Sequence, residues 1–187
     1  MAQDDIEQAC PPVTPPLKRH PSLQPLSREH MNGLIQARAL QRASESDEAA
    51  RRRTVAGFVK AWQTEIRPHF DDEERLLLPL VDSQALRDRL LDEHTTLRRL
   101  AERCVRDPMA AANDPELLRE LGARLHDHIR WEEREFFEAV QRHHPNALTG
   151  LSAEAAAIEH LRPGSRARHS LSEGGTRDCC GEVNDER

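Results

Sequence analysis

Between Val55 and Leu80, inward-facing positions recur at alternating steps of four and three residues, a spacing that predicts one long amphipathic helix. Two polar side chains interrupt the apolar stripe, because His69 and Glu73 occupy successive positions on it. A charged glutamate in a protein core is costly unless an opposite charge compensates it. The stripe therefore predicts a helical fold that buries a polar group for a specific reason.

Four amphipathic helices account for most of the chain. We expect them to begin after or at Ser27, Asp47, Ser83 and Asp114, and the last three to end near Val81, Arg106 and His143. Pro68 should bend the second helix just before His69, since proline removes a backbone donor and crowds the preceding turn. No segment shows the alternation of a strand. Short connections between such helices favour an all-α, antiparallel up-down four-helix bundle.

The two ends of the chain differ in composition from the predicted bundle. Residues 1–25 are rich in proline and are expected to form an extended leader. We expect the bundle over residues 26–145 and a possible short helix within 146–161. Residues 162–187 are polar and rich in glycine and serine, which predicts a disordered tail. A length of 187 residues suits a single folded domain.

Charge and hydropathy limit the classes of function. The chain has 27 Lys and Arg against 33 Asp and Glu, and its basic residues are spread over helix faces, so we expect no nucleic-acid partner. It has no run of about 18 apolar residues, so we expect no membrane span. The N-terminus lacks the apolar stretch of a signal peptide, and the four cysteines do not form a disulfide framework. A soluble, cytoplasmic protein is expected, and a protein partner remains unknown.

Histidines interrupt the apolar stripes of all four predicted helices. The fourth helix repeats the pattern of the second, with His128 and Glu132 four residues apart on its apolar face. His30 and His94 lie on the apolar faces of the first and third helices. One such histidine alone is most often a core side chain bonded to a carbonyl group. Four histidines and two glutamates on facing stripes are explained together by a shared cation.

In an antiparallel bundle, these polar positions fall at one height. His69 lies twelve residues before the predicted end of its helix, His94 eleven after the start of the third, and Glu132 eleven before the end of the fourth. At about 1.5 Å per residue, these positions agree within a few ångströms. We therefore predict that a metal site replaces one layer of the core. The predicted ligands are His30, His69, Glu73, His94, His128 and Glu132.

The ligand types indicate which metals fit. Imidazole and carboxylate groups suit iron, manganese or zinc. Six protein ligands exceed the four of a tetrahedral zinc site, and they suit two ions, each held by two histidines and bridged by the two glutamates. Two iron ions are the first choice, and manganese, mixed metals or zinc are the alternatives. Glu74, Glu133 and Glu135 lie near the predicted ligands and are interpreted as solvated or supporting residues.

The succession of an isolated histidine and a His-x-x-x-Glu pair occurs twice, as His30 then "HFDDE", and His94 then "HIRWE". This pattern resembles the hemerythrin-like, or HHE cation-binding, family over about residues 18 to 143. The resemblance implies an oxo- or carboxylate-bridged di-iron centre in a four-helix bundle. Members of the family include oxygen carriers, oxygen or redox sensors, nitric-oxide-related proteins, iron sensors and proteins that repair iron–sulfur clusters.

Two positions depart from the oxygen-carrying members of that family. Arg98 stands four residues after His94, where they have another histidine, and the last pair is His-x-x-x-Glu, where they have His and Asp five apart. The set of four histidines and two glutamates is closer to the iron–sulfur repair type. We expect a non-haem di-iron protein that binds, senses or reduces a small ligand such as O2, NO or peroxide. The alternatives are iron handling, iron sensing or cluster repair without turnover, and a structural metal site in an interaction module.

Overall fold

The computed structural model describes residues 18–162, and within this range every element is helical. The short 3-10 helices are η1 (Pro21–Leu23) and η3 (Leu78–Leu80), and the π-helical segments are η2 (Trp62–Ile66) and η4 (Glu132–Phe136). The α-helices are α1 (Gln24–Ser44), α2 (Glu48–Ala61), α3 (Arg67–Leu76), α4 (Gln84–Arg106), α5 (Pro108–Ala112), α6 (Pro115–Trp131), α7 (Phe137–His143), α8 (Pro145–Gly150) and α9 (Ser152–Leu161). The predicted all-α fold is confirmed.

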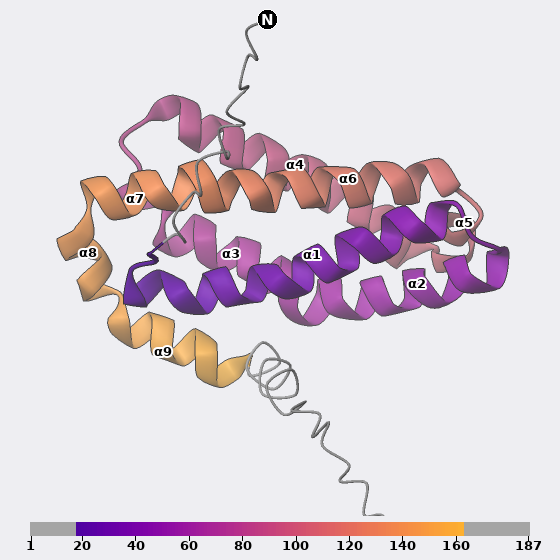
Figure 1. The fold of residues 1–187 in the computed structure, drawn as a ribbon, viewed down its shortest axis with the longest axis horizontal. Helices are drawn as coiled ribbons and strands as arrows, with labels where there is room; N and C mark the ends of the chain where they lie inside the picture. Colours follow the sequence, from indigo (N-terminus) through magenta and orange to yellow (C-terminus); the bar gives the residue numbers. More distant parts are fainter. Residues whose placement is uncertain (1–17, 163–187) are drawn as a thin grey trace, which may run out of the picture.

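The helices line up as four antiparallel rods (Figure 1). α1 forms the first rod, α2, η2 and α3 the second, α4 the third, and α6, η4 and α7 the fourth. α8 and α9 then turn back along the outside, and α9 packs against α1 and η1 (Figure 1). No helix among the described residues is long and apolar enough to cross a membrane.

Side-chain caps fix where three of the rods begin. The carboxylates of Asp47 and Asp114 and the hydroxyl of Ser83 each accept a hydrogen bond from a backbone N–H in the first turn of the helix that follows. The predicted cap at Ser27 was wrong, because α1 begins at Gln24. Ser27 instead donates its hydroxyl to the Glu133 carboxylate at 2.7 Å. The last residues of the predicted leader therefore belong to helix.

Pro68 does not end the second rod. The chain widens into η2 just before it, where the Arg67 N–H bonds to the carbonyl oxygen of Trp62, five residues back. This wider turn accommodates the proline ring and its missing donor. A second π-helical segment, η4, begins at Glu132 without any proline, and the sequence did not predict it. Each of the two rods that carry a His-x-x-x-Glu pair thus contains a π-helical turn near that pair, in which the backbone hydrogen bonds span five residues.

Two apolar clusters fill the bundle, one on each side of a polar layer. One contains Phe70 and Leu97, and the other contains Leu77 and Leu90. His94 lies between Leu90 and Leu97 on α4, so it separates the clusters along that rod. Polar side chains replace one layer of the core, as the spacing predicted.

The connections and flanks differ from the sequence-based prediction in two places. Residues 107–115, expected to be a plain connection, contain α5, and residues 145–150 form α8. The predicted short helix near the C-terminal end is present as α9, which adds Ile158 to the second apolar cluster. Residues 1–17 and 163–187, which include most of the predicted leader and nearly all of the predicted tail, lie outside the described residues.

Candidate metal centre

The structure brings all six predicted ligand residues together. His30 lies on α1, His69 and Glu73 on α3, His94 on α4 and His128 on α6, and Glu132 is the first residue of η4. All six are buried, and Glu73, His94 and Glu132 have no exposed surface. Their ligand atoms form two overlapping groups that could each hold a metal ion, and both groups include the two glutamates.

The carboxylate of Glu73 divides its oxygens between two pairs of imidazoles. Oε1 lies 3.2 Å from Nε2 of His69 and 3.7 Å from Nε2 of His30. Oε2 faces the other way and lies 3.4 Å from Nε2 of His94. A carboxylate placed in this way can bridge two cations.

Glu132 repeats this arrangement from the fourth rod. Its Oε2 lies 3.2 Å from Nε2 of His30, and its Oε1 lies 3.0 Å from Nε2 of His128 and 3.5 Å from Nε2 of His94. The centre therefore has two halves that share both glutamates. We call them the His30–His69 half and the His94–His128 half.

Six of the polar atoms that meet in the centre have no hydrogen-bond partner. Both oxygens of Glu73 and of Glu132, and Nε2 of His94 and of His128, are buried and have no hydrogen-bond partner. Buried carboxylates normally have such partners, and their absence is costly. In the other half, Nε2 of His30 and of His69 are 2.9 Å apart. Two imidazole nitrogens bound at about 2.1 Å to one ion, at right angles, are about 3 Å apart. The residues present therefore fit a pair of metal ions.

The carboxylates raise the pKa of the imidazoles. Burial lowers the pKa of His69, but the charge of Glu73 and the hydrogen bond to Glu29 outweigh this effect and raise the pKa to about 9. Burial also lowers the pKa of His94, and the carboxylates around that ring raise it to about 10. Positive charge is thus required to balance the buried glutamates, and a metal ion must compete with protons for the imidazoles.

A ring of four further glutamates surrounds the centre. Each imidazole donates its Nδ1–H to one of them, which fixes the tautomer and directs Nε2 inward. The pairs are His30–Glu133, His69–Glu29, His94–Glu74 and His128–Glu93, at 2.6, 3.0, 2.7 and 2.7 Å. Each glutamate comes from the rod next to that of its histidine, so the hydrogen bonds run around the bundle from rod to rod.

An arginine pairs with each glutamate of this ring. The pairs are Arg19–Glu133, Arg162–Glu29, Arg98–Glu74 and Arg89–Glu93. Arg98, which stands where oxygen-carrying hemerythrins have a further histidine, pairs with Asp71 and with Glu74, the glutamate that holds the predicted ligand His94. Each of the four imidazoles of the centre is therefore held by an arginine–glutamate pair.

Part of this ring is predictable from the sequence. The sequence predicts that Glu74 and Glu133 are solvated or supporting residues, and in the structure they accept hydrogen bonds from His94 and His30. Glu135, also considered, is mostly exposed and accepts a hydrogen bond from the Trp131 indole at 3.2 Å. Glu29 and Glu93 were missed. A signal was present, because each glutamate of the ring is the immediate neighbour of a predicted ligand in the sequence.

Two buried phenylalanines, one from each apolar cluster, stack on imidazoles of the centre. The Phe70 ring stacks on His94 with centroids 3.9 Å apart, and Phe137 stacks on His30 at 5.2 Å. A cavity of about 10 Å³ lies beside the His30–His69 half, lined in part by Gly33, Ile66 and Ile129. This volume holds roughly one water molecule, so only a very small molecule fits beside this half of the centre.

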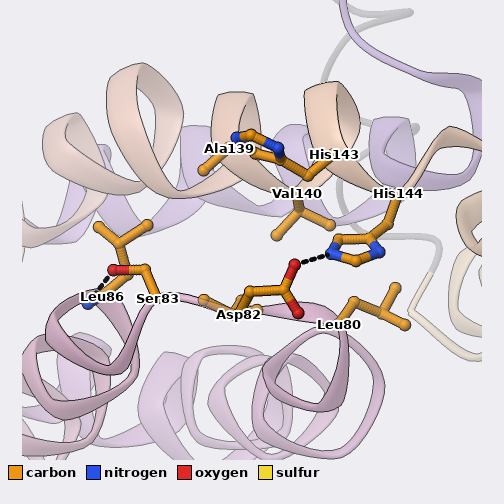
Figure 2. A pocket seen from close by; sticks show the side chains of 9 residues that line it. Leu80, Asp82, Ser83, Leu86, Ala139, Val140, His143 and His144 are labelled. Carbon is orange, nitrogen blue, oxygen red and sulfur yellow. Dashed lines mark hydrogen bonds and ion pairs between the residues drawn. The ribbon is translucent and has the colours of Figure 1, made fainter.

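A second, separate pocket lies at the end of the bundle, between the start of α4 and α7 (Figure 2). Its volume is about 260 Å³, and its lining is mostly apolar. His144 and Asp82 form an ion pair at 2.9 Å across it (Figure 2). None of the six predicted ligands lines this pocket, and residues 18–162 contain no third group of side chains that could hold a metal.

The fold and the buried centre together define an all-α metal-binding protein built around paired His-x-x-x-Glu motifs. Residues 23–140 match the family model described as the hemerythrin HHE cation-binding domain, and the chain belongs to this family. A comparison with curated proteins found no match, and neither did a comparison with solved structures. The family match includes all six predicted ligands.

Proposed function

We propose that this protein holds two iron ions, one in each half of the centre, and that it binds, senses or reduces a small ligand there. The observation that carries the proposal is the division of the Glu73 and Glu132 oxygens between two pairs of imidazoles. Each half then offers two imidazoles and two carboxylate oxygens. Ligand sets of two histidines with carboxylate oxygen are typical of non-haem iron sites that keep positions open.

Iron is favoured over softer metals by the chemistry of the donors. The centre contains imidazole and carboxylate groups and no thiolate, because Cys104, the one cysteine among the described residues, is buried in an apolar cluster. Bound iron would supply redox chemistry and open coordination positions for a small ligand. The chain itself would hold the imidazoles, bridge with two carboxylates and exclude bulk water with Phe70 and Phe137.

The size of the cavity limits the ligand class. About 10 Å³ beside the His30–His69 half accommodates a diatomic molecule or a peroxide far more easily than an organic substrate. Reversible binding, sensing and reduction of such a ligand are three alternative functions that the same centre could perform. They differ in whether the ligand leaves unchanged, alters a partner or is consumed.

Anaerobic reconstitution with Fe(II) tests the proposal. We expect two irons per chain by elemental analysis, and new absorption bands when O2, NO or H2O2 is added. His128→Ala should lose metal, and His126→Ala is the matched control, because His126 lies two residues away on the same helix and faces Asp127 at the surface. One tightly held zinc ion without a redox response would indicate a structural site instead. Iron that passes readily to an apo iron–sulfur protein, without those bands, would indicate iron handling.

A further inference from the structure

The four arginine–glutamate pairs around the centre fall into two classes by their origin in the chain. Arg89 and Arg98 lie on α4, inside the bundle, and support the His94–His128 half. Arg19 and Arg162 lie outside the residues 23–140 that match the family, one before them and one after. Both of these flanking arginines support the His30–His69 half.

The flanking arginines are also the more deeply buried ones. The side chains of Arg19 and Arg162 are 7% and 13% exposed, against 31% and 46% for Arg98 and Arg89. Ion pairs shielded from water are screened less by salt than exposed ones. Removing one partner of a buried pair leaves the other charge uncompensated. The flanking arginines should therefore matter more to their half of the centre.

Arg162 binds two acidic residues from different rods at once. Its Nη2 lies 3.1 Å from the Glu29 carboxylate on α1 and 2.6 Å from that of Asp72 on α3, and its Nε also donates to Glu29. Glu29 in turn accepts from Nδ1 of His69 at 3.0 Å. The guanidinium fork thus fixes the carboxylate that orients a predicted ligand.

Arg19 makes the equivalent contact from the other flank. Its Nη2 donates to both the carboxylate and the backbone carbonyl of Glu133, each at 2.6 Å. Glu133 accepts from Nδ1 of His30 at 2.6 Å and from the hydroxyl of Ser27. Both histidines of this half are therefore oriented through arginines that lie outside the matched residues 23–140.

We infer that Arg19 and Arg162 are positioning residues that complete the His30–His69 half of the metal centre from outside the matched residues 23–140. The inference rests on the two-metal centre proposed above. A metal-bound imidazole depends on the carboxylate that holds its other nitrogen, and loss of such a partner typically weakens metal binding by about 10- to 100-fold. α9 then has a second role, because it carries Arg162 to the metal centre as well as covering the apolar core.

The test compares Arg162→Ala with Arg98→Ala in the full chain. Co(II) and Fe(II) are titrated anaerobically against a coloured chelator, which gives the two stepwise affinities. We expect Arg162→Ala to weaken one site, by no more than the roughly 10- to 100-fold that loss of the Glu29 carboxylate itself would cause, and to leave the other within about threefold of wild type. Arg98→Ala should weaken the opposite site, and by less. The Co(II) absorption band that Arg162→Ala changes should be the one that His69→Ala removes.

Arg28→Ala is the matched control for the docking of α9. Arg28 on α1 pairs with Glu159 on α9, close to Arg162 in the chain, and its side chain hydrogen-bonds to Glu159 and Gln24 rather than to a glutamate of the ring. We expect this variant to keep both metal affinities. If it loses metal as Arg162→Ala does, the effect comes from detachment of α9 and the inference is overturned. Unchanged affinities in Arg162→Ala overturn it directly.

The same titration separates failure of this inference from failure of the proposed function. A wild-type chain that takes up fewer than two ions contradicts the two-metal proposal, whatever the variants do. A wild-type chain with two ions, together with Arg162→Ala and Arg98→Ala variants that change the same Co(II) band, contradicts only the inference. Far-UV circular dichroism of each variant verifies that the helices are intact.

Discussion

The two halves of the metal centre are nearly alike on the inside and different on the outside. The rings of His30 and His69 have centroids 4.7 Å apart at 73°, and those of His94 and His128 are 4.8 Å apart at 71°. Both pairs face the same two carboxylates, those of Glu73 and Glu132. Outside these rings, one half is supported by the chain flanks and the other by α4.

The solvent side of each half differs as well. The His30–His69 half borders the cavity of about 10 Å³, whereas His128 and Glu93 border an open hollow of about 320 Å³ with Asp92 and Asp127 on its edge. A repeated sequence motif can therefore place equivalent ligands in both halves, while their surroundings make the halves unequal. Function should depend on that inequality, because the inner geometry gives a ligand no reason to prefer one side.

The largest effect should come from a substitution that acts on both halves at once. Glu73→Gln keeps the size of the side chain but removes the charge that faces both pairs of imidazoles. We expect both ions to be lost, with an affinity change larger than the roughly 10- to 100-fold typical of a supporting residue. Elemental analysis after anaerobic loading measures the loss. The melting temperature in the presence of metal should fall too. Free metal at a concentration of about 1,000 times its Kd stabilises the folded state by about 4 kcal/mol, and the variant would lose this stabilisation.

Glu135→Gln is the control for that experiment. Glu135 lies on the same π-helical segment as Glu132, but its side chain is 61% exposed and points to Trp131. The Glu135→Gln variant should bind two ions, as the wild-type protein does. Two ions retained in Glu73→Gln would show that this carboxylate does not bridge, and the comparison of two halves would lose its basis.

The next effect in size separates the halves. His69→Ala and His94→Ala each remove one imidazole, one from each half, and both rings are buried. We expect each variant to bind one ion in place of two, because the opposite half keeps both of its histidines and both carboxylates. Metal counting and Co(II) spectra measure this, and the two variants should retain different bands. If either variant loses both ions, the halves bind cooperatively and cannot be treated as separate sites.

The sequence predicted the six central residues because helix periodicity is local. Each histidine and glutamate of the centre continues a stripe that can be read within one helix, and the lengths of the helices set a common height. Which glutamate of the ring meets which histidine could not be predicted in this way. That pairing depends on the order in which the rods surround the centre. Glu29 on α1, for example, accepts its hydrogen bond from His69 on α3 and not from a histidine of its own rod.

The contacts of Arg19 and Arg162 with the glutamate ring could not be predicted from the sequence at all. Arg19 and Glu133 are 114 positions apart in the sequence, and Arg162 and Glu29 are 133 apart. Their contacts depend on η1 and on the return of α9 along α1, neither of which has a periodic signal that points to the centre. Ser27 is similar: its residue type predicted a helix cap, whereas tertiary contact with Glu133 determines its role.

The smallest predicted effect concerns only the cavity, and so only the His30–His69 half. Gly33 lines that cavity, and a Cβ added there would come within 2.6 Å of Cδ1 of Ile129. The isoleucine would have to move, and it borders the same cavity. We expect Gly33→Ala to keep two ions but to bind NO or O2 several-fold more slowly, which stopped-flow absorbance can measure.

Gly57→Ala is the matched control, because Gly57 also lies in a helix but a Cβ there meets nothing within 4 Å. Both substitutions favour the helix by up to about 1 kcal/mol, so a shared change in melting temperature reports propensity alone. A slower ligand-binding rate in Gly33→Ala only would assign ligand entry to the His30–His69 half. Equal rates in the two variants would mean that ligands reach the centre by another route, and the open hollow beside His128 would become the side to test.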